Sequence, residues 1–73
     1  EAFTRLVERY RAAVVAVAAA HLRNDVEAAH DVAQEAFIHA YLRLSHLRDP
    51  ERFSAWLRRI TVNLCADFQR RER

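Results

Sequence analysis

Glycine is absent from the 73 residues of this sequence, and proline and cysteine each occur once. Without glycine, the chain cannot form a glycine-rich loop that cradles a phosphate. A single cysteine excludes an internal disulfide framework, and a lone thiol is typical of a reducing, cytoplasmic setting. No apolar run is long enough to cross a membrane, because residues 12–20 form a short stretch made mostly of alanine. These absences favour a small helical domain with short connections.

Lysine is absent too, so all 12 basic residues are arginines, whose planar guanidinium suits phosphate and carboxylate partners. Residues 1–24 carry four arginines against two acids, and residues 25–47 carry four acids against one arginine. Residues 48–73 carry seven arginines against four acids. An acidic middle followed by a basic end indicates two different partners.

Hydrophobic periodicity predicts three helices, over about residues 2–22, 25–44 and 50–70. Their apolar rows are Phe3, Leu6, Val7, Tyr10, Val14 and Val17 in the first, Val26, Ala29, Ala33, Phe37, Ala40 and Leu44 in the second, and Phe53, Trp56, Leu57, Ile60, Leu64 and Phe68 in the third. Asn24 is expected to adopt a left-handed or capping conformation between the first two helices, with Glu27 resembling the partner of a capping box. Small residues in the second row would let a neighbouring helix approach closely.

A loop over residues 45–50 is expected before the third helix, where Asp49 suits the N-cap and Pro50 the first helical position. Three amphipathic helices with short links predict an all-α fold, a small three-helix bundle of antiparallel type.

The predicted second helix has a distinctive face opposite its core row. Its members are Glu27, Asp31, Gln34, Glu35, Ile38 and Leu42. Branched apolar residues rimmed by carboxylates and an amide are typical of a protein contact. A solvated face with incidental apolar residues is equally compatible with this pattern.

The predicted third helix has a basic flank. It comprises Arg52, Arg59, Asn63 and Arg70, and Arg48 lies in the loop just before. Arginines supply phosphate contacts, and Asn63 can read a base edge. Phe53 and Trp56 could stack an unpaired base, although such aromatics are also ordinary core residues. The arginines are alternatively a solvated face, paired in part with Asp67 or Glu72.

Catalytic and metal-binding patterns are incomplete. Glu27-x-x-His30 has the spacing of a carboxylate-bridged di-iron helix, but the other helices supply neither a matching motif nor further carboxylates. Periodicity places Cys65 on the polar side of the third helix, without a base nearby in sequence. We therefore expect no metal, no cofactor and no enzymatic activity.

Two stretches resemble a known family. Asp31-Val-Ala-Gln34-Glu35-Ala-Phe37 resembles the D-x-x-Q-E-x-F signature of region 2 of bacterial RNA polymerase sigma factors. Residues 53–67, FSAWLRRITVNLCAD, resemble the F-x-x-W-L-x-R-I-x-x-N-x-x-x-D stretch of the extracytoplasmic-function group. The motifs have the family's order and separation, and the likeness covers essentially all 73 residues.

The resemblance implies core polymerase as the partner of the first motif. Asp31, Gln34 and Glu35 would dock on the clamp helices of the large subunit. Ile38 would add an apolar contact to the same surface.

The second motif implies promoter DNA as a further partner. Arg59 and Asn63 would recognise and open the minus-ten element and capture a flipped base of its non-template strand, with Trp56 on the same surface. Unpairing costs a few kcal/mol per base, which stacking and hydrogen bonds must recover. The phosphate contacts implied are Arg48, Arg52 and Arg70.

The sequence departs from the family pattern at three points. Asn24-Asp25 replaces the frequent Gly-Asp before the second helix, and His30 stands where an acid is common. Leu47 stands where the recognition loop, which captures the flipped base in the family, is often aromatic.

The resemblance carries further expectations. The sequence starts at Glu1 and has no room for region 4, so we interpret it as one region 2 domain, residues 1–73, from a longer protein. An anti-sigma factor is an implied partner, and no membrane partner is expected. A helical protein-interaction module without DNA binding is the alternative function. Self-association through the apolar part of the second helix is also open.

Overall fold

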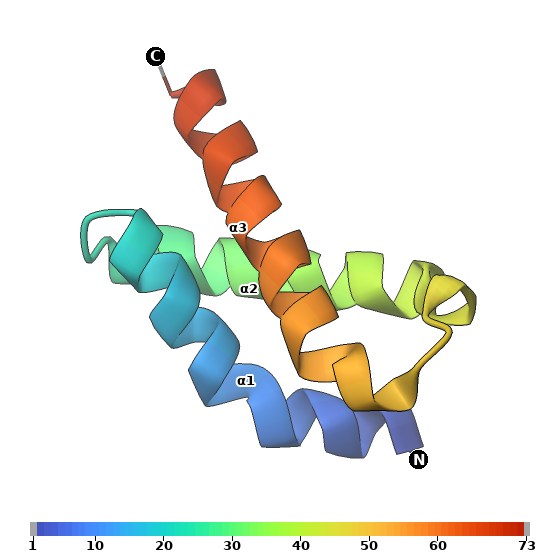
Figure 1. Ribbon diagram of the computed structural model, residues 1–73. Coiled ribbons are helices and arrows are strands. Elements are labelled where there is room, and N and C mark those ends of the chain that lie inside the picture. The colour runs from blue at the N-terminus through green and yellow to red at the C-terminus, as the bar shows by residue number, and fades with distance from the viewer. Residues whose placement is uncertain (1, 73) are drawn as a thin grey trace.

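The computed structural model describes residues 2–72, which form three α-helices and, within that range, no strand. Helix α1 spans Ala2–His21, α2 spans Val26–Leu42 and α3 spans Phe53–Arg71. Two short 3₁₀ helices, η1 at Leu44–His46 and η2 at Pro50–Arg52, lead into α3. Helices α1 and α2 run in opposite directions, whereas α3 crosses over α2 (Figure 1). The all-α, three-helix prediction is confirmed, and antiparallel packing is confined to α1 and α2.

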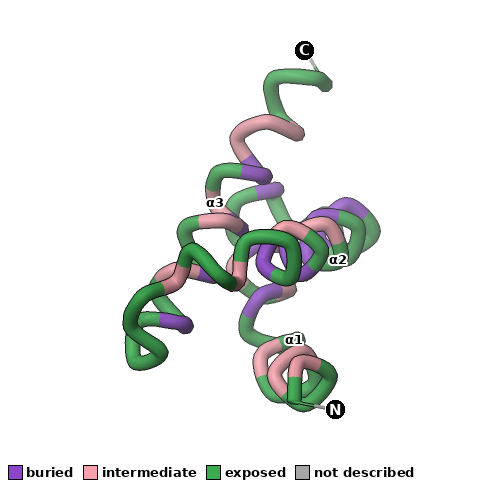
Figure 2. The backbone as a smooth tube through the Cα atoms, turned by 90° about the vertical axis from the view of Figure 1, so that its right-hand side faces the viewer, coloured by how far each residue is buried: buried purple, intermediate pink, exposed green. Residues whose placement is uncertain are grey.

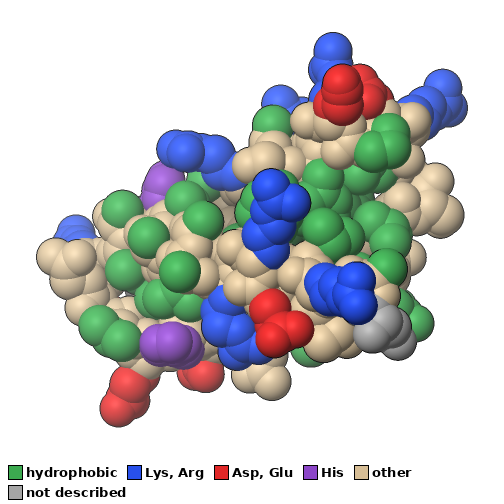
Figure 3. Space-filling view, turned by 90° about the horizontal axis from the view of Figure 1, so that it is seen from below, with side chains coloured by type: hydrophobic (Ala, Val, Ile, Leu, Met, Phe, Trp, Pro, Cys, Tyr) green, Lys and Arg blue, Asp and Glu red, His purple; other side chains and the backbone are tan. Residues whose placement is uncertain are grey.

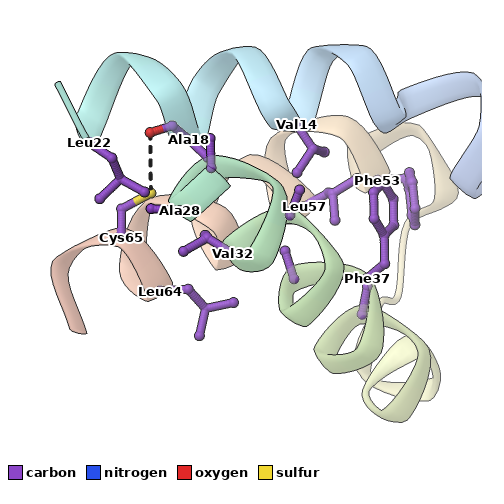
Figure 4. Close-up of a cluster of buried hydrophobic side chains, with 14 residues drawn as sticks. Val14, Ala18, Leu22, Ala28, Val32, Phe37, Phe53, Leu57, Leu64 and Cys65 are labelled. Carbon is purple, nitrogen blue, oxygen red and sulfur yellow. Dashed lines mark hydrogen bonds between the residues drawn. The ribbon is translucent and has the colours of Figure 1, made fainter. Parts of the chain in front are cut away.

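The core lies where the three helices meet (Figures 2 and 4). Its buried members are Val14, Ala18, Leu22, Ala28, Ala29, Val32, Ala33, Ala36, Phe37, Ala40, Phe53, Leu57, Leu64 and Cys65. Five of the seven buried residues of α2 are alanines, so α1 and α3 can both approach its backbone closely. The sequence-based expectation about small residues is therefore confirmed. Thr61, the buried polar residue, satisfies its hydroxyl by donating to the Leu57 carbonyl at 2.9 Å.

The turn between α1 and α2 uses two left-handed residues. Arg23 has φ 57° and Asn24 has φ 63°. The Asn24 amide donates to the Ala19 carbonyl at 2.9 Å, which satisfies one of the free carbonyls at the end of α1. The left-handed prediction for Asn24 is confirmed, but the cap of α2 is Asp25, whose carboxylate accepts from the Ala28 amide at 3.1 Å.

The segment between α2 and α3 differs from the prediction at both ends. Helix α2 ends at Leu42 and not at residue 44, because Arg43 leaves helical geometry with φ −112° and ψ 12°. The predicted cap at Asp49 is confirmed: its carboxylate accepts from the Glu51 amide at 3.0 Å, with Pro50 in the first turn. That turn is a 3₁₀ helix, however, and α3 begins only at Phe53.

Two burial predictions are wrong. Val26 was expected in the core row but is 59% exposed, because Ala28 and Ala29 turn toward the core in the first turn of α2 and Val26 faces away. Cys65 was expected on the polar side of the third helix but is only 1% exposed. Helix α3 packs against both α1 and α2, so its buried arc is wider than one apolar row and includes Cys65.

Candidate functional site

The face of α2 that carries the first motif is open to solvent. Asp31, Gln34 and Ile38 are exposed, Ile38 by 54%, and Glu35 is half-buried. Helical spacing brings these four side chains onto adjoining turns. No ion pair within residues 2–72 involves Asp31 or Glu35. The structure therefore presents two carboxylates, an amide and an aliphatic group together, with no ionic partner inside the described chain.

A groove of about 530 Å³ adjoins this face, between α1 and α2. Its lining residues are Phe3, Val7, Arg11, Val15, His30, Ala33, Gln34, Phe37, Ile38, Tyr41 and Leu42. Gln34 of the first motif and Ile38, which lies on the same face of α2, thus also line the groove. Tyr41 was not singled out from the sequence, although it is 60% exposed and packs edge-on against Phe3 at 5.1 Å between ring centroids. The groove forms where α1 and α2 pack together, so the apolar row of one helix alone could not predict it.

A second hollow, of about 430 Å³, lies between α2 and the last turns of α3. It is lined by Glu35, His39, Leu64, Asp67, Arg70 and Arg71. Arg70 forms an ion pair with Asp67, one of the pairings considered from the sequence. The structure thus places Arg70 beside a residue of the first motif, whereas the sequence grouped it with the basic flank of the third helix.

The remaining residues of the basic flank point outward. Arg59 and Asn63 are exposed, one turn apart on α3, and neither takes part in an ion pair or a side-chain hydrogen bond within residues 2–72. Arg52 is exposed near the start of α3, with its Nε 3.7 Å from the carboxylate of Asp49. Arg48 is exposed in the preceding loop. The structure brings a cation and an amide together at Arg59 and Asn63, and leaves both free to contact a ligand.

The aromatic residues near this flank divide between core and surface. Phe53 is buried, which favours the core interpretation for that residue, and Trp56 is half-buried against it with ring centroids 6.0 Å apart. Tyr10 of α1 also packs against Phe53, with ring centroids 5.3 Å apart, and the guanidinium of Arg9 lies 5.7 Å from the Tyr10 ring centroid.

Arginines on the face seen from below are separated from one another. In Figure 3 the basic side chains stand apart, with hydrophobic and acidic groups between them. On this face the arginines are therefore isolated cations and do not form one continuous basic patch.

The loop before α3 is anchored by apolar residues. Leu44 and Leu47 are half-buried and pack against the core, and the Leu47 amide donates to the Leu44 carbonyl at 3.1 Å. Ser45, His46 and Arg48 remain exposed. Leu47, which departs from the family pattern, thus serves as an anchor of the loop.

Residues 2–72 bring no three His, Cys, Asp or Glu side chains into a metal-binding group. Glu27 and His30 are both exposed on α2. Burial raises the pKa of the Cys65 thiol, which keeps it protonated and unreactive at neutral pH. Within the described range, no helix is long and apolar enough to span a bilayer.

Comparison with known proteins identifies the family. Residues 6–73 match the family described as Sigma-70 region 2, and the chain belongs to that family. It is 45% identical over 73 residues to a protein named "Probable RNA polymerase sigma factor RfaY" from Xanthomonas campestris pv. campestris. The extracytoplasmic-function (ECF) sigma factor SigW of Bacillus subtilis is 37% identical over 73 residues, and the ECF sigma-E factor of Escherichia coli K12 is 39% identical over 69. The resemblance drawn from the two motifs is therefore confirmed.

The chain corresponds to a minor part of these relatives. All of it aligns with the Xanthomonas and Bacillus proteins and 93% of it with the E. coli protein. It covers 18%, 38% and 35% of their respective lengths. No solved structure matches the chain.

Proposed function

We propose that this chain is a transcription initiation module that docks on core RNA polymerase through α2 and recognises the minus-ten promoter element through α3. The observation that carries the proposal is the separation of two unpartnered surfaces. Asp31, Gln34 and Ile38 are exposed on α2, and Arg59 and Asn63 are exposed on α3. Membership of the sigma-70 region 2 family supports this assignment of polymerase docking to α2 and of promoter recognition to α3.

The α2 surface suits a basic helix of the polymerase, for which we propose the clamp helices of the large subunit. The carboxylates of Asp31 and Glu35 would pair with partner cations, and the Gln34 amide can donate and accept together. Ile38 would lose its exposed apolar area to the partner. Docking would therefore combine specific polar contacts with apolar burial.

The α3 surface suits an opened DNA strand. Asn63 can form two hydrogen bonds with a base edge, and Arg59 can neutralise a phosphate or stack on a base. Arg48 and Arg52 would contact phosphates from the loop side, and Trp56 has part of its ring exposed for stacking. Arg70 would contribute least, because a phosphate must compete with Asp67 for its guanidinium.

An inhibitory partner is part of the proposal. An anti-sigma factor that covers Asp31, Gln34 and Ile38 would exclude polymerase by occupying the same groups. A chain held in this way would neither dock nor open promoter DNA.

The decisive test is binding of purified core polymerase by the chain, with Gln34→Ala/Glu35→Ala beside the wild type. We expect the double change to weaken binding at least about a hundredfold, since it removes a charged contact and an amide from the interface centre. Thr4→Ala/Glu8→Ala is the matched control, because both side chains are exposed on α1 and line none of the hollows described above. Circular dichroism would confirm that all three chains fold.

A folded wild-type chain that does not bind polymerase would contradict the proposal. The alternative, a helical interaction module with another protein partner and no DNA binding, would then take its place. Equal binding by the wild type and the Gln34→Ala/Glu35→Ala variant would move the docking surface away from α2.

A further inference from the structure

Helices α1 and α3 run in broadly the same direction, and contacts at both ends hold them side by side (Figure 1). Tyr10 packs against Phe53 at the start of α3, and the side-chain amide of Gln69 donates to the His21 carbonyl at 2.7 Å near its end. Between these contacts the two helices leave a hollow of about 120 Å³, which we call the α1–α3 hollow.

The α1–α3 hollow has an apolar floor and a polar rim. Buried Val14 and Leu57 line its floor. Its rim includes the half-buried ring of Tyr10 from α1 and the exposed side chains of Ser54 and Arg58 from α3. A ligand in this hollow would therefore meet two hydroxyl groups and a cation around a small apolar surface.

The charge at the hollow is positive. Arg58 lines it, and no Asp or Glu within residues 2–72 does. On the α1 side, the guanidinium of Arg9 lies 5.7 Å from the ring centroid of Tyr10. Neither arginine forms an ion pair within residues 2–72, and Glu8, the acid next to Arg9, projects about 100° away around α1. Each helix thus supplies one cation that has no ionic partner inside the described chain.

Size and composition together select the ligand. The hollow has less than a quarter of the volume of the α1–α2 groove, about 120 against 530 Å³, so it is too small for a helix about 10 Å across. Arginine, serine and tyrosine side chains are typical contacts of DNA phosphates. The apolar floor suits the carbon face of a sugar, which a free inorganic anion lacks. A sugar–phosphate unit of a nucleic-acid strand supplies both groups.

The hollow also adjoins the DNA surface proposed for α3. Arg58 directly precedes Arg59, so the two guanidinium groups leave the same turn of the helix. Tyr10 packs against Phe53, which in turn packs against Trp56 with ring centroids 6.0 Å apart. A strand bound by Arg59 and Trp56 therefore has a short path to the hollow around the first turns of α3.

We propose that the α1–α3 hollow holds one sugar–phosphate unit of the promoter DNA strand, with Arg9 and Arg58 on its phosphate. This inference rests on the proposed DNA recognition by α3 and extends that surface onto α1. It gives a role to Arg58, which occupies an unspecified position of the second motif. The contact is independent of sequence, because sugar and phosphate are the same in every nucleotide.

Variants at the rim test this contact. Arg9→Ala and Arg58→Ala each remove one cation, and Arg5→Ala removes one from an exposed position a further turn along α1, away from Tyr10. Ser54→Asp adds a carboxylate to the rim, and Thr4→Asp adds one at an exposed position of α1 outside the hollow. All of these side chains are exposed, so the helical circular dichroism signal should be unchanged.

The measurement is the fluorescence anisotropy of a labelled single-stranded DNA of mixed sequence, bound to the complex of the chain with core polymerase. Polymerase is kept at a concentration that saturates each variant, so a docking defect does not enter the result. Core polymerase without the chain is the blank.

We expect Arg9→Ala and Arg58→Ala each to raise Kd about fivefold and to make the dependence of log affinity on log salt concentration shallower by about 0.7. Ser54→Asp should raise Kd about tenfold, because its carboxylate repels the phosphate. Arg5→Ala and Thr4→Asp should stay within about twofold of the wild type. Arg58→Lys should retain most of the affinity, because it keeps the cation.

Other results separate the two proposals. If Arg9→Ala and Arg58→Ala bind DNA like the wild type while Arg59→Ala does not, the hollow proposal fails and DNA recognition by α3 stands. If Arg9→Ala and Arg58→Ala weaken binding while Arg59→Ala does not, the hollow contact stands and the phosphate contact of Arg59 fails. If the complex binds DNA no better than core polymerase alone, both fail.

Competition distinguishes a DNA strand from other anions. Inorganic phosphate or a poly-glutamate peptide should lower DNA binding no more than chloride at the same ionic strength. If either competitor lowers DNA binding by the wild type and leaves Arg58→Ala unaffected, the hollow is a site for free anions or acidic peptides and the proposal is overturned.

Discussion

Arg59 and Asn63 are neighbours on one exposed side of α3, yet their chemistry predicts different effects on DNA binding. Asn63→Ala should reduce discrimination at one base position by about 1–3 kcal/mol and leave other sequences little changed, because an amide reads a base edge. Arg59→Ala should weaken binding to all DNA sequences and reduce the salt dependence of that binding, because a phosphate contact releases counterions. The measurement is binding of single-stranded oligonucleotides to the chain–polymerase complex at several salt concentrations.

Arg5→Ala serves as the control for this pair, since it removes one exposed positive charge from α1 and leaves α3 unchanged. If Asn63→Ala lowers the affinity equally for all DNA sequences, Asn63 does not recognise a base. A salt dependence unchanged in Arg59→Ala would exclude its phosphate contact.

Single residues differ in how well the sequence predicted them. The exposure of Arg59 and Asn63 followed from helical spacing alone, because their positions lie beside the apolar row. The position of Arg70 beside Glu35 did not, because it depends on where α3 crosses α2. The burial of Cys65 likewise depends on a second helix that covers the flank of α3.

At the level of elements, the connection between α1 and α2 contains an unfavourable residue. Arg23 is held at φ 57°, a conformation that costs a residue with a Cβ about 1 kcal/mol and costs glycine little. Arg23→Gly should therefore stabilise the chain by about 1 kcal/mol, measured as the free energy of unfolding in urea.

Asn24→Gly is the comparison for that prediction. Asn tolerates the left-handed region better than arginine, so this change should alter stability by only a few tenths of a kcal/mol. A loss of stability in Arg23→Gly would mean that the arginine side chain supplies contacts that outweigh its backbone strain.

The residues at which the helices begin and end were harder to predict than the presence of the three helices. The apolar rows gave all three helices, but they could not show that Arg43 leaves helical geometry or that the turn after Asp49 is 3₁₀. Capping groups near one another, such as Asn24 and Asp25, also compete for the same role. The structure assigns the cap to Asp25, since its carboxylate reaches the Ala28 amide.

At the scale of the whole molecule, Cys65 couples stability to pH. Its thiol is buried near Leu22 and Ala28, and its Sγ lies 3.9 Å from the Ala18 carbonyl of α1 (Figure 4). Burial raises the pKa of this thiol above its ordinary value of 9.0. Above about pH 9 the unfolded state therefore loses a proton that the folded state keeps, and rising pH favours unfolding.

Urea unfolding of the wild type and Cys65→Ala between pH 7 and pH 10 tests this coupling. The free energy of unfolding of the wild type should fall relative to that of the variant as pH rises past about 9. The variant differs from the wild type only at residue 65, so the difference between the two profiles reports on Cys65 alone. Parallel pH profiles would show that Cys65 is not the group responsible.

The whole-molecule arrangement also explains why the candidate surfaces were only partly predictable. The α2 face was readable because one helix carries all of its residues. The groove was not, because four of its eleven lining residues come from α1, whose apolar row predicted burial for Phe3 and Val7, which remain half-exposed. Apolar residues that face a partner follow the same periodicity as apolar residues that face the core.

The anchored loop before α3 has an evolutionary consequence. Leu44 and Leu47 hold the loop to the core, and Asp49 caps the turn that follows, so the scaffold places no packing demand on the exposed Ser45, His46 and Arg48. Substitutions at these three positions would leave the fold intact. If the loop touches promoter DNA, sequence preference could diverge between genes quickly on an unchanged scaffold.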